Sequence, residues 1–258
     1  MAIIKKTTTK PVKKNLATKK SVTKKVTPKK ATSLKSVTKK PQAQKPKPIV
    51  KTAILAEKID PKIFPIGKFS VPHEYTDVVI NNLTQELKSL PKDLKKVAKK
   101  IKSDAQLQAS YRDGGWSIEQ IIHHLADSHM NAFIRFKLSL TENNPVIKPY
   151  NQDLWAETAD IQLPIKISIK LLKALHTKWV CLLENMDKND FKRTYTHPEY
   201  KTTPALQEIL AQYAWHGKHH LAQIELALKS VEIEKTEEEK KSKEIKSIKP
   251  KPKPARKH

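Results

Sequence analysis

The chain has 258 residues, and its charge is too unevenly distributed for all of them to share one hydrophobic core. Residues 1–60 contain 18 lysines, no arginine and two acidic residues, which gives this stretch a net charge of +16. Residues 230–258 carry +4, whereas residues 61–229 carry only +5 and hold all four tryptophans. We therefore expect one folded domain over residues 61–229 between two charged tails.

The composition excludes several classes of protein. No apolar run is long enough to span a bilayer, and the first residues lack the apolar segment of a secretory signal, so we expect a cytoplasmic protein without a membrane partner. Cys181 is the only cysteine, which excludes an internal disulfide. We interpret Cys181 as a small helical residue rather than a reactive thiol, because no neighbour in the sequence would activate it.

The first tail, residues 1–60, is built mainly from Lys, Thr, Ser, Val, Ala and Pro, and the sequence SVTKK occurs at both 21–25 and 36–40. Its composition predicts disorder, because it offers too little apolar surface to offset the entropy lost on folding. Its charge predicts a function of another class, binding of nucleic acid. Such binding would be non-specific, since the tail has neither arginine nor aromatic residues for reading bases. The other tail, residues 230–258, is predicted to be helical at its start and extended where Lys and Pro alternate.

The first two predicted helices precede residue 143. Apolar residues at helical spacing begin near His73, and Pro91 is expected to break or restart that helix before Ile101. Ser117, followed three residues later by Gln120, forms a capping box and predicts the start of a second helix at about residue 118. This second helix should run to about residue 142.

The other two helices follow a long connection over residues 143–164, a length typical of a functional loop or a crossover. Pro164 is expected to start a helix that reaches about Met186. Thr203 and Pro204 are expected to cap and begin the last helix, which should end near Lys229. The pattern predicts an all-α four-helix bundle with one long crossover, a fold whose core commonly holds metal ions.

The last helix carries two histidines at the spacing of metal ligands. His216 and His220 are one turn apart in a continuous apolar stripe, so both imidazoles should point the same way. Two hydrogen-bonded core histidines are the alternative interpretation, but each would then need partners for two ring nitrogens in apolar surroundings. His219 is rotated by about 60° from His216 around the helix and is a weaker candidate.

A tetrahedral site needs at least one more ligand, and the middle helix offers a second group of histidines. His129 falls at the centre of the apolar stripe of that helix, whereas His124 lies well to one side of it. Helical periodicity leaves both histidines open as the third ligand, since either could face a neighbouring helix.

Several segments of the chain together resemble one known family. They are residues 64–69, 111–142, 148–150, 153–157, 174–176, 179, 197–199 and 213–222, and the resemblance covers about residues 64–228. The sequence resembles the YfiT branch of the DinB-like proteins. The resemblance implies a four-helix bundle, often a homodimer, that acts as a metal-dependent hydrolase with a zinc or nickel site of three histidines. The ligands would be His124, His216 and His220, and His129 would lie behind them or in the core.

Three neutral imidazoles would leave a divalent metal with an open position for water or a substrate atom, as in catalytic zinc sites. Hydrolysis of a small-molecule substrate is therefore the expected reaction. An alternative implied by the resemblance is an S-transferase that joins a low-molecular-weight thiol, bacillithiol, to an electrophile. A metal-binding bundle without catalysis is a third interpretation, because three histidines alone do not specify a reaction.

Other polar residues near these motifs could serve the same site. Asp127 and Glu119 are candidates for moving a proton or orienting a ligand imidazole. A solvated helix face is the alternative for both. Arg112 and Lys148 are candidates for holding a carboxylate or phosphate of the substrate. Among the aromatic residues, Tyr150 and Trp155 are expected at the pocket mouth, and Trp116, Trp179 and Trp215 are expected in the core.

Overall fold

The computed structural model describes residues 60–248, and the side chains of residues 60–245. The predicted disorder of the first tail concerns residues that lie, except for Asp60, outside the described part. The predicted extended segment after residue 248 also lies outside it. Residues 60–248 form helices, turns and isolated bridges but no β-strand, which confirms the all-α prediction. Within the same range, no helix combines the length and the apolar character needed to cross a membrane.

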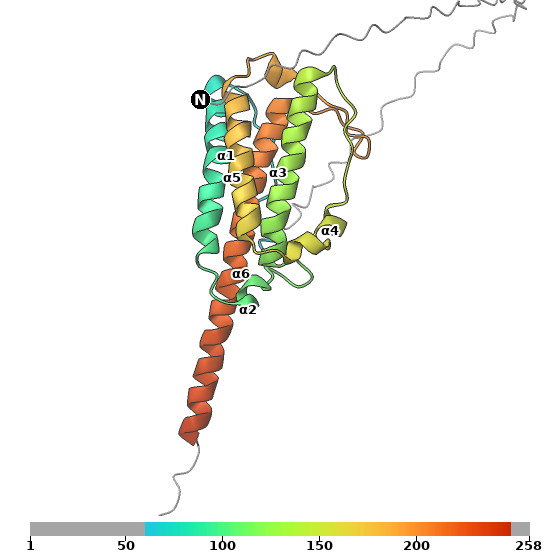
Figure 1. The fold of residues 1–258 in the computed structure, drawn as a ribbon. Helices are drawn as coiled ribbons and strands as arrows, with labels where there is room; N and C mark the ends of the chain where they lie inside the picture. The colour runs from blue at the N-terminus through green and yellow to red at the C-terminus, as the bar shows by residue number, and fades with distance from the viewer. Residues whose placement is uncertain (1–59, 249–258) are drawn as a thin grey trace, which may run out of the picture. The chain divides into compact units, whose positions relative to one another are not determined.

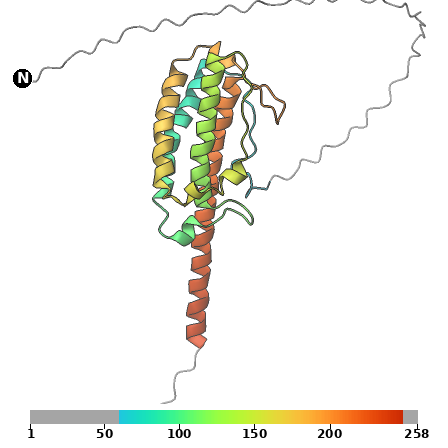
Figure 2. The same cartoon turned by 45° about the vertical axis from the view of Figure 1, so that its right-hand side comes forward.

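Four long helices make up the bundle in Figure 1: α1 (Asp77–Ala98), α3 (Ile118–Thr141), α5 (Lys166–Glu184) and α6 (Leu206–Ile248). Short helices α2 (Asp104–Leu107) and α4 (Gln152–Trp155) lie in the connections, together with 3₁₀ turns at Ala159–Gln162 and Asp190–Lys192. Helix α1 packs against α5 and α6, and α3 packs against the same two helices, so α1 and α3 occupy opposite corners. The connection after α3 returns along the side of the bundle, and α3 and α5 therefore run parallel (Figure 2).

The helix starts follow local capping chemistry. At α3, the hydroxyl of Ser117 accepts from the backbone N–H of Gln120, and the side-chain oxygen of Gln120 accepts from the N–H of Ser117. This confirms the predicted capping box. Helix α1 begins at Asp77 rather than near His73, because the hydroxyl of Thr76 accepts from the N–H of Val79 and so caps the helix there.

Helix α6 differs from its predicted bounds at both ends. It begins at Leu206 instead of at Thr203 and Pro204, since Glu208 accepts from the N–H of Ala205 and satisfies a donor of the first turn. At its other end it passes Lys229 and continues to Ile248, beyond the end of the other helices in Figure 1.

The prediction that Pro91 breaks or restarts the first helix is wrong. Helix α1 continues through Pro91, whose ring is buried. A proline inside a helix removes one N–H donor and leaves the carbonyl four residues earlier without its usual partner. That carbonyl belongs to Leu87, and it accepts a hydrogen bond from Nδ1 of His176 on α5, at 2.6 Å. A neighbouring helix therefore provides the bond that Pro91 cannot.

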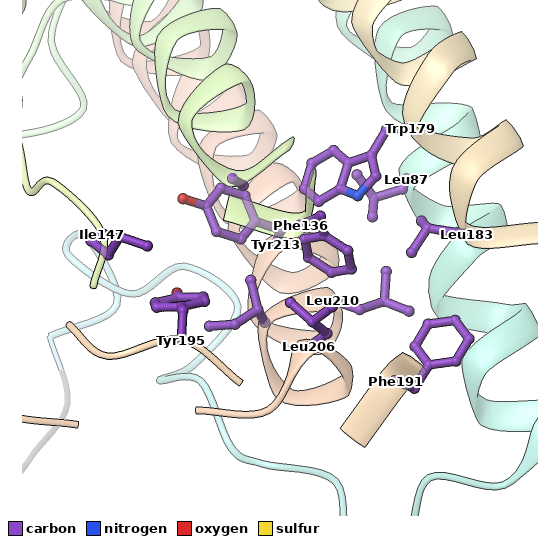
Figure 3. Close-up of a cluster of buried hydrophobic side chains, with 12 residues drawn as sticks. Leu87, Phe136, Ile147, Trp179, Leu183, Phe191, Tyr195, Leu206, Leu210 and Tyr213 are labelled. Carbon is purple, nitrogen blue, oxygen red and sulfur yellow. The ribbon is translucent and has the colours of Figure 1, made fainter. Parts of the chain in front are cut away.

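The hydrophobic core is divided into two clusters along the length of the bundle. One cluster, drawn in Figure 3, includes Leu87, Phe136, Trp179 and Tyr213. The other includes Leu94, Ile122, Leu172 and Ile224. Along the helices, several buried or partly buried histidines lie between the residues of these two clusters. Five of them have rings that contact one another, and we call these five the histidine layer: His124 and His129 of α3, His176 of α5, and His216 and His220 of α6. The bundle thus places polar rings in the middle of its interior.

Candidate metal centre

Three histidines of this layer converge on one point. Nε2 of His216 lies 3.2 Å from Nε2 of His124 and 3.1 Å from Nε2 of His220. All three ligand atoms lie within 4.8 Å of one another, and among the described residues this is the group of His, Cys, Asp or Glu side chains able to hold a metal ion. Two ligand nitrogens of a tetrahedral zinc ion lie about 3.3 Å apart when each Zn–N bond is about 2.0 Å long. The spacing of the imidazoles therefore fits a small divalent ion.

The protonation of His220 also suits metal binding. Its Nδ1 lies 2.8 Å from the side-chain oxygen of Gln223, whose amide nitrogen donates to the carbonyl of Ile63. Because that amide oxygen can only accept, Nδ1 of His220 must carry the proton. In the neutral ring Nε2 is then unprotonated and offers its lone pair towards His216 and His124. The donor set fits a cation at the point of convergence.

Burial keeps these rings in their neutral form. It lowers the pKa of His124 from its ordinary value to about 4. Burial, together with the neighbouring histidines, lowers the pKa of His216 and His220 well below the ordinary range. Each ring is therefore neutral at neutral pH and has one nitrogen with a free lone pair, which is the form that binds a metal ion.

The three histidines form part of the wall of a cavity of about 380 Å³. The cavity is bounded by the loop before α3, by α4, by α6 and by the segment that precedes α1. Its walls include Arg112, Trp116, Asp153, Trp215 and His219 in addition to the three convergent rings. A small molecule in this cavity would have direct access to the point at which the imidazoles meet.

The structure separates the histidines that periodicity left open. His124 belongs to the convergent group, whereas His129 is completely buried behind it, with its Nε2 3.3 Å from Nδ1 of His216. His219 lines the cavity and stacks on Trp215, with ring centroids 4.6 Å apart, but it lies outside the convergent group. The roles of these residues in metal binding remain predictions.

The two candidate carboxylates lie away from the cavity wall. Glu119 is partly buried and accepts from the side-chain amide of Gln108 at 2.7 Å. Asp127 is half-buried, and burial, with a smaller effect from Asp160, raises its pKa to about 6. Neither residue lines the cavity around the three imidazoles, although Asp127 titrates near neutral pH.

Of the candidate substrate-binding residues, one lines the cavity and the others do not. Arg112 lines the cavity, whereas Lys148 is exposed and does not. Tyr150 and Trp155 pack on each other with centroids 4.5 Å apart but do not line this cavity either, and burial raises the pKa of Tyr150 to about 12.

The expectation that three tryptophans lie in the core is correct for Trp179 alone. Trp179 is fully buried between helices. Trp116 instead lines the cavity and packs against His124 and His220, with centroid distances of 4.5 and 6.3 Å, and Trp215 lines it beside His219. Both are only partly buried, because the cavity removes neighbours from one side of each ring.

Sequence reasoning missed three features of the site. Gln223 is absent from the predicted site residues, yet its side chain bonds His220; its position three residues after His220 on the same helix is the signal that could have found it. Asp153 enters the cavity from α4, and its place in the long connection gave no indication of this. The carbonyl of Ile63 reaches Gln223 from a segment 160 residues away, a contact that no local pattern encodes.

Comparisons with known proteins agree with this architecture. The family model described as the DinB superfamily matches residues 86–224. "Putative metal-dependent hydrolase OB0782" of Oceanobacillus iheyensis is 49% identical over 161 residues, which cover 62% of this chain and 92% of the relative. A protein of Bacillus cereus strain 03BB102, also named "Putative metal-dependent hydrolase", is 45% identical over the same coverage.

A solved structure also matches this chain in sequence and fold. It is that of YfiT from Bacillus subtilis, described as "a probable metal-dependent hydrolase with an unusual four-helix bundle topology". It superposes with a TM-score of 0.64 at 39% identity and covers 66% of this chain and 98% of YfiT. From the family match and the similarity to these relatives, we conclude that the chain belongs to the DinB superfamily.

Proposed function

We propose that the protein is a metal-dependent hydrolase whose His124, His216 and His220 bind a divalent ion, zinc or nickel. The observation that carries this proposal is the convergence of three neutral imidazoles on the wall of a cavity, where Nε2 of His216 lies 3.2 Å from that of His124 and 3.1 Å from that of His220. Relatives at 45 to 49% identity bear the name of metal-dependent hydrolases, which supports it. A divalent ion with three imidazole ligands supplies Lewis acidity: it lowers the pKa of water towards neutrality and polarises an ester or amide oxygen.

The residues around the ligands define what the cavity can admit. Trp116 packs against the rings of His124 and His220 and shields one side of the imidazole group from water. Gln223 holds His220 in one orientation through the bond to Nδ1. The volume of about 380 Å³ suits a small-molecule substrate rather than a polymer.

Arg112 gives this cavity a recognition group for an anion. Its Nη1 donates to the carbonyl of Asp113 at 2.9 Å, but its buried Nε has no hydrogen-bond partner within residues 60–248. Because Arg112 lines the cavity, its guanidinium is placed to bind a carboxylate or phosphate, the groups that its planar set of N–H donors fits best. We therefore propose that the substrate carries one anionic group beside the bond to be cleaved.

Metal analysis by mass spectrometry tests the site directly. The wild type should contain one divalent ion per chain, and His124→Ala, His216→Ala and His220→Ala should each lose most of it. His197→Ala is a matched control, because His197 is also buried but stacks on Tyr200 outside the histidine layer. Stoichiometric metal in all three ligand variants would refute the site.

The reaction is tested on the metal-loaded protein. Small esters and amides with and without a carboxylate should be hydrolysed by the wild type and not by His216→Ala. A parallel assay follows consumption of monobromobimane with and without bacillithiol. Turnover that requires the thiol, in the absence of any hydrolysis, would contradict the hydrolase proposal and favour an S-transferase.

The homodimer implied by the family resemblance and the cytoplasmic location expected from the composition are part of the same proposal. Sedimentation equilibrium of the full chain should give a mass near twice 29.5 kDa. A mass that stays at 29.5 kDa at all concentrations would exclude the dimer.

A further inference from the structure

A row of buried hydrogen bonds leads away from the proposed metal site and crosses all four long helices. Nδ1 of His216 on α6 lies 3.3 Å from Nε2 of His129 on α3. Nδ1 of His129 lies 2.9 Å from Nε2 of His176 on α5, and Nδ1 of His176 lies 2.6 Å from the carbonyl oxygen of Leu87 on α1. We call these residues the histidine chain.

The carbonyl at its end fixes the direction of every bond in the histidine chain. A carbonyl oxygen only accepts, so Nδ1 of His176 carries a proton and, in a neutral ring, Nε2 does not. Nδ1 of His129 must therefore donate to it, which leaves Nε2 of His129 as the acceptor for Nδ1 of His216. The one remaining nitrogen of the chain, Nε2 of His216, is then without a proton.

That nitrogen is the one that faces His124 and His220. Nε2 of His220 is also unprotonated, because its Nδ1 donates to Gln223. The two lone pairs meet 3.1 Å apart with no proton between them. Such an arrangement is repulsive until a cation lies between the two nitrogens, so the histidine chain and Gln223 together prepare a receptor for a positive ion.

Pro91 makes the end of the chain available. In an uninterrupted helix the N–H of residue 91 would donate to the carbonyl of Leu87. Proline has no N–H, and the carbonyl of Leu87 accepts from His176 instead. The proline that local rules treat as a helix breaker thus frees the acceptor that sets the protonation of three rings.

Water cannot replace these bonds. His129 and His176 have exposed fractions of 0% and 2%. His129 stacks on His176 with centroids 4.9 Å apart, and the rings of Trp179 and Tyr213 pack against its edges. In such dry surroundings an imidazole in the wrong tautomer would leave a donor facing a donor, and no water could satisfy either group.

We propose that His129 and His176 are positioning residues that hold His216 in the Nδ1–H tautomer, with Nε2 presented to the metal ion. The inference rests on the proposed metal site and is independent of the reaction. It goes beyond the three ligands, because it assigns a role to two histidines and one proline that do not touch the ion. Partners of this kind orient a ligand ring and raise its basicity.

Imidazole nitrogen shifts in the metal-free protein test the chain without any assay of activity. Long-range ¹H–¹⁵N correlation on the full chain should show His176, His129 and His216 all protonated at Nδ1 and unprotonated at Nε2. A proton on Nε2 of His129 or His216 would overturn the proposal. If the wild type shows these tautomers but binds no metal, the proposed metal site is refuted, whereas the proposed hydrogen-bond direction along the histidine chain is supported.

Substitution of His176 tests the consequence for the metal. His176→Phe removes the acceptor for His129, and Zn²⁺ affinity in a competition with a chromophoric chelator should fall by about 10- to 100-fold. His123→Phe is the matched control: His123 is also buried on α3 and bonds the carbonyl of Leu163 and the hydroxyl of Ser168. Its loss should leave the affinity within about twofold of the wild type.

A second variant separates positioning from folding. His176→Asn keeps one donor and one acceptor and should recover part of the affinity and of the Nδ1–H signal of His216. Circular dichroism confirms that each variant is folded before metal is titrated. A folded His176→Phe protein with wild-type affinity and an unchanged His216 tautomer would refute the positioning role.

Discussion

His220 and Gln223 lie three residues apart on α6, and Nδ1 of His220 is 2.8 Å from the amide oxygen of Gln223. The same amide donates to the carbonyl of Ile63 at 3.2 Å. A segment that precedes the bundle thereby determines which way the amide is turned, and the amide in turn determines which nitrogen of His220 is free. The segment around Ile63 is thus part of the site although it contributes only a main-chain atom.

Replacement of Gln223 should weaken metal binding without removing any ligand. Gln223→Leu leaves Nδ1–H of His220 without an acceptor, so Zn²⁺ affinity should fall by about 10-fold or more. Gln223→Glu keeps an acceptor and should retain or increase the affinity, since a carboxylate raises the basicity of the ring. Chelator competition measures both. Equal affinities for the wild type and Gln223→Leu would contradict the role of the amide.

Removal of the first tail should separate two activities. A variant without residues 1–59 keeps Ile63 and every residue of the cavity, so its metal content should equal that of the full chain. It loses most of the positive charge, and retention on DNA at low salt should disappear. Electrophoretic mobility shifts at 20 and 200 mM salt, alongside metal analysis, measure the two properties. DNA retention by the shortened protein would show that the domain itself binds nucleic acid.

The metal-free protein should lose stability as the pH falls from 6.5 to 4. Burial lowers the pKa of His124 and of His176 to about 4, whereas both are near 6.5 in the unfolded chain. Between these values the unfolded chain binds protons that the folded chain does not, so the free energy of unfolding decreases with decreasing pH. Each histidine contributes at most about 1.4 kcal/mol per pH unit.

Urea unfolding at pH 7.5, 6 and 5 measures this slope, which should be shallower in His176→Phe. Asp127 has the opposite effect on the pH dependence of the free energy of unfolding. Its pKa is raised to about 6, so the folded chain binds its proton first and gains stability as the pH falls. Asp127→Asn should therefore steepen the loss. A slope that is identical in all three proteins would contradict the assignment to these groups.

Arg112 should affect substrate binding more than turnover. Arg112→Ala removes the guanidinium from the cavity wall, and KM for a carboxylate-bearing substrate should rise by about tenfold or more while kcat changes little. A neutral ester of the same size should be cleaved as before. Lys148→Ala is the control, because Lys148 is exposed outside the cavity. A fall in kcat with unchanged KM would argue against a recognition role.

Local chemistry predicted much of the fold. The capping box of Ser117 and Gln120 placed the start of α3 correctly, because its two bonds form within four residues. The spacing of His216 and His220 likewise predicted that their rings lie together, since one helical turn brings them to the same side. Both features depend on one helix only.

The sequence predictions were wrong or left open where the position of a residue depends on contacts with another helix. A helical wheel of α3 shows the directions of His124 and His129 but not what each meets on α6. His124 meets Nε2 of His216, on the side where His220 also converges, whereas His129 meets Nδ1 of His216. Pro91 breaks an isolated helix, yet α5 supplies the missing partner for Leu87. Trp116 faces a cavity that exists only once α4 and α6 are in place.

The histidine layer also has a consequence for how the helices align. Apolar contacts are not directional, and cores that rely on them alone lose the uniqueness of their packing before they lose stability. Hydrogen bonds between buried rings permit no such shift, because a displacement of about 5.4 Å would separate every donor in the layer from its acceptor. His129, bonded to both α5 and α6, therefore specifies the register of three helices at once.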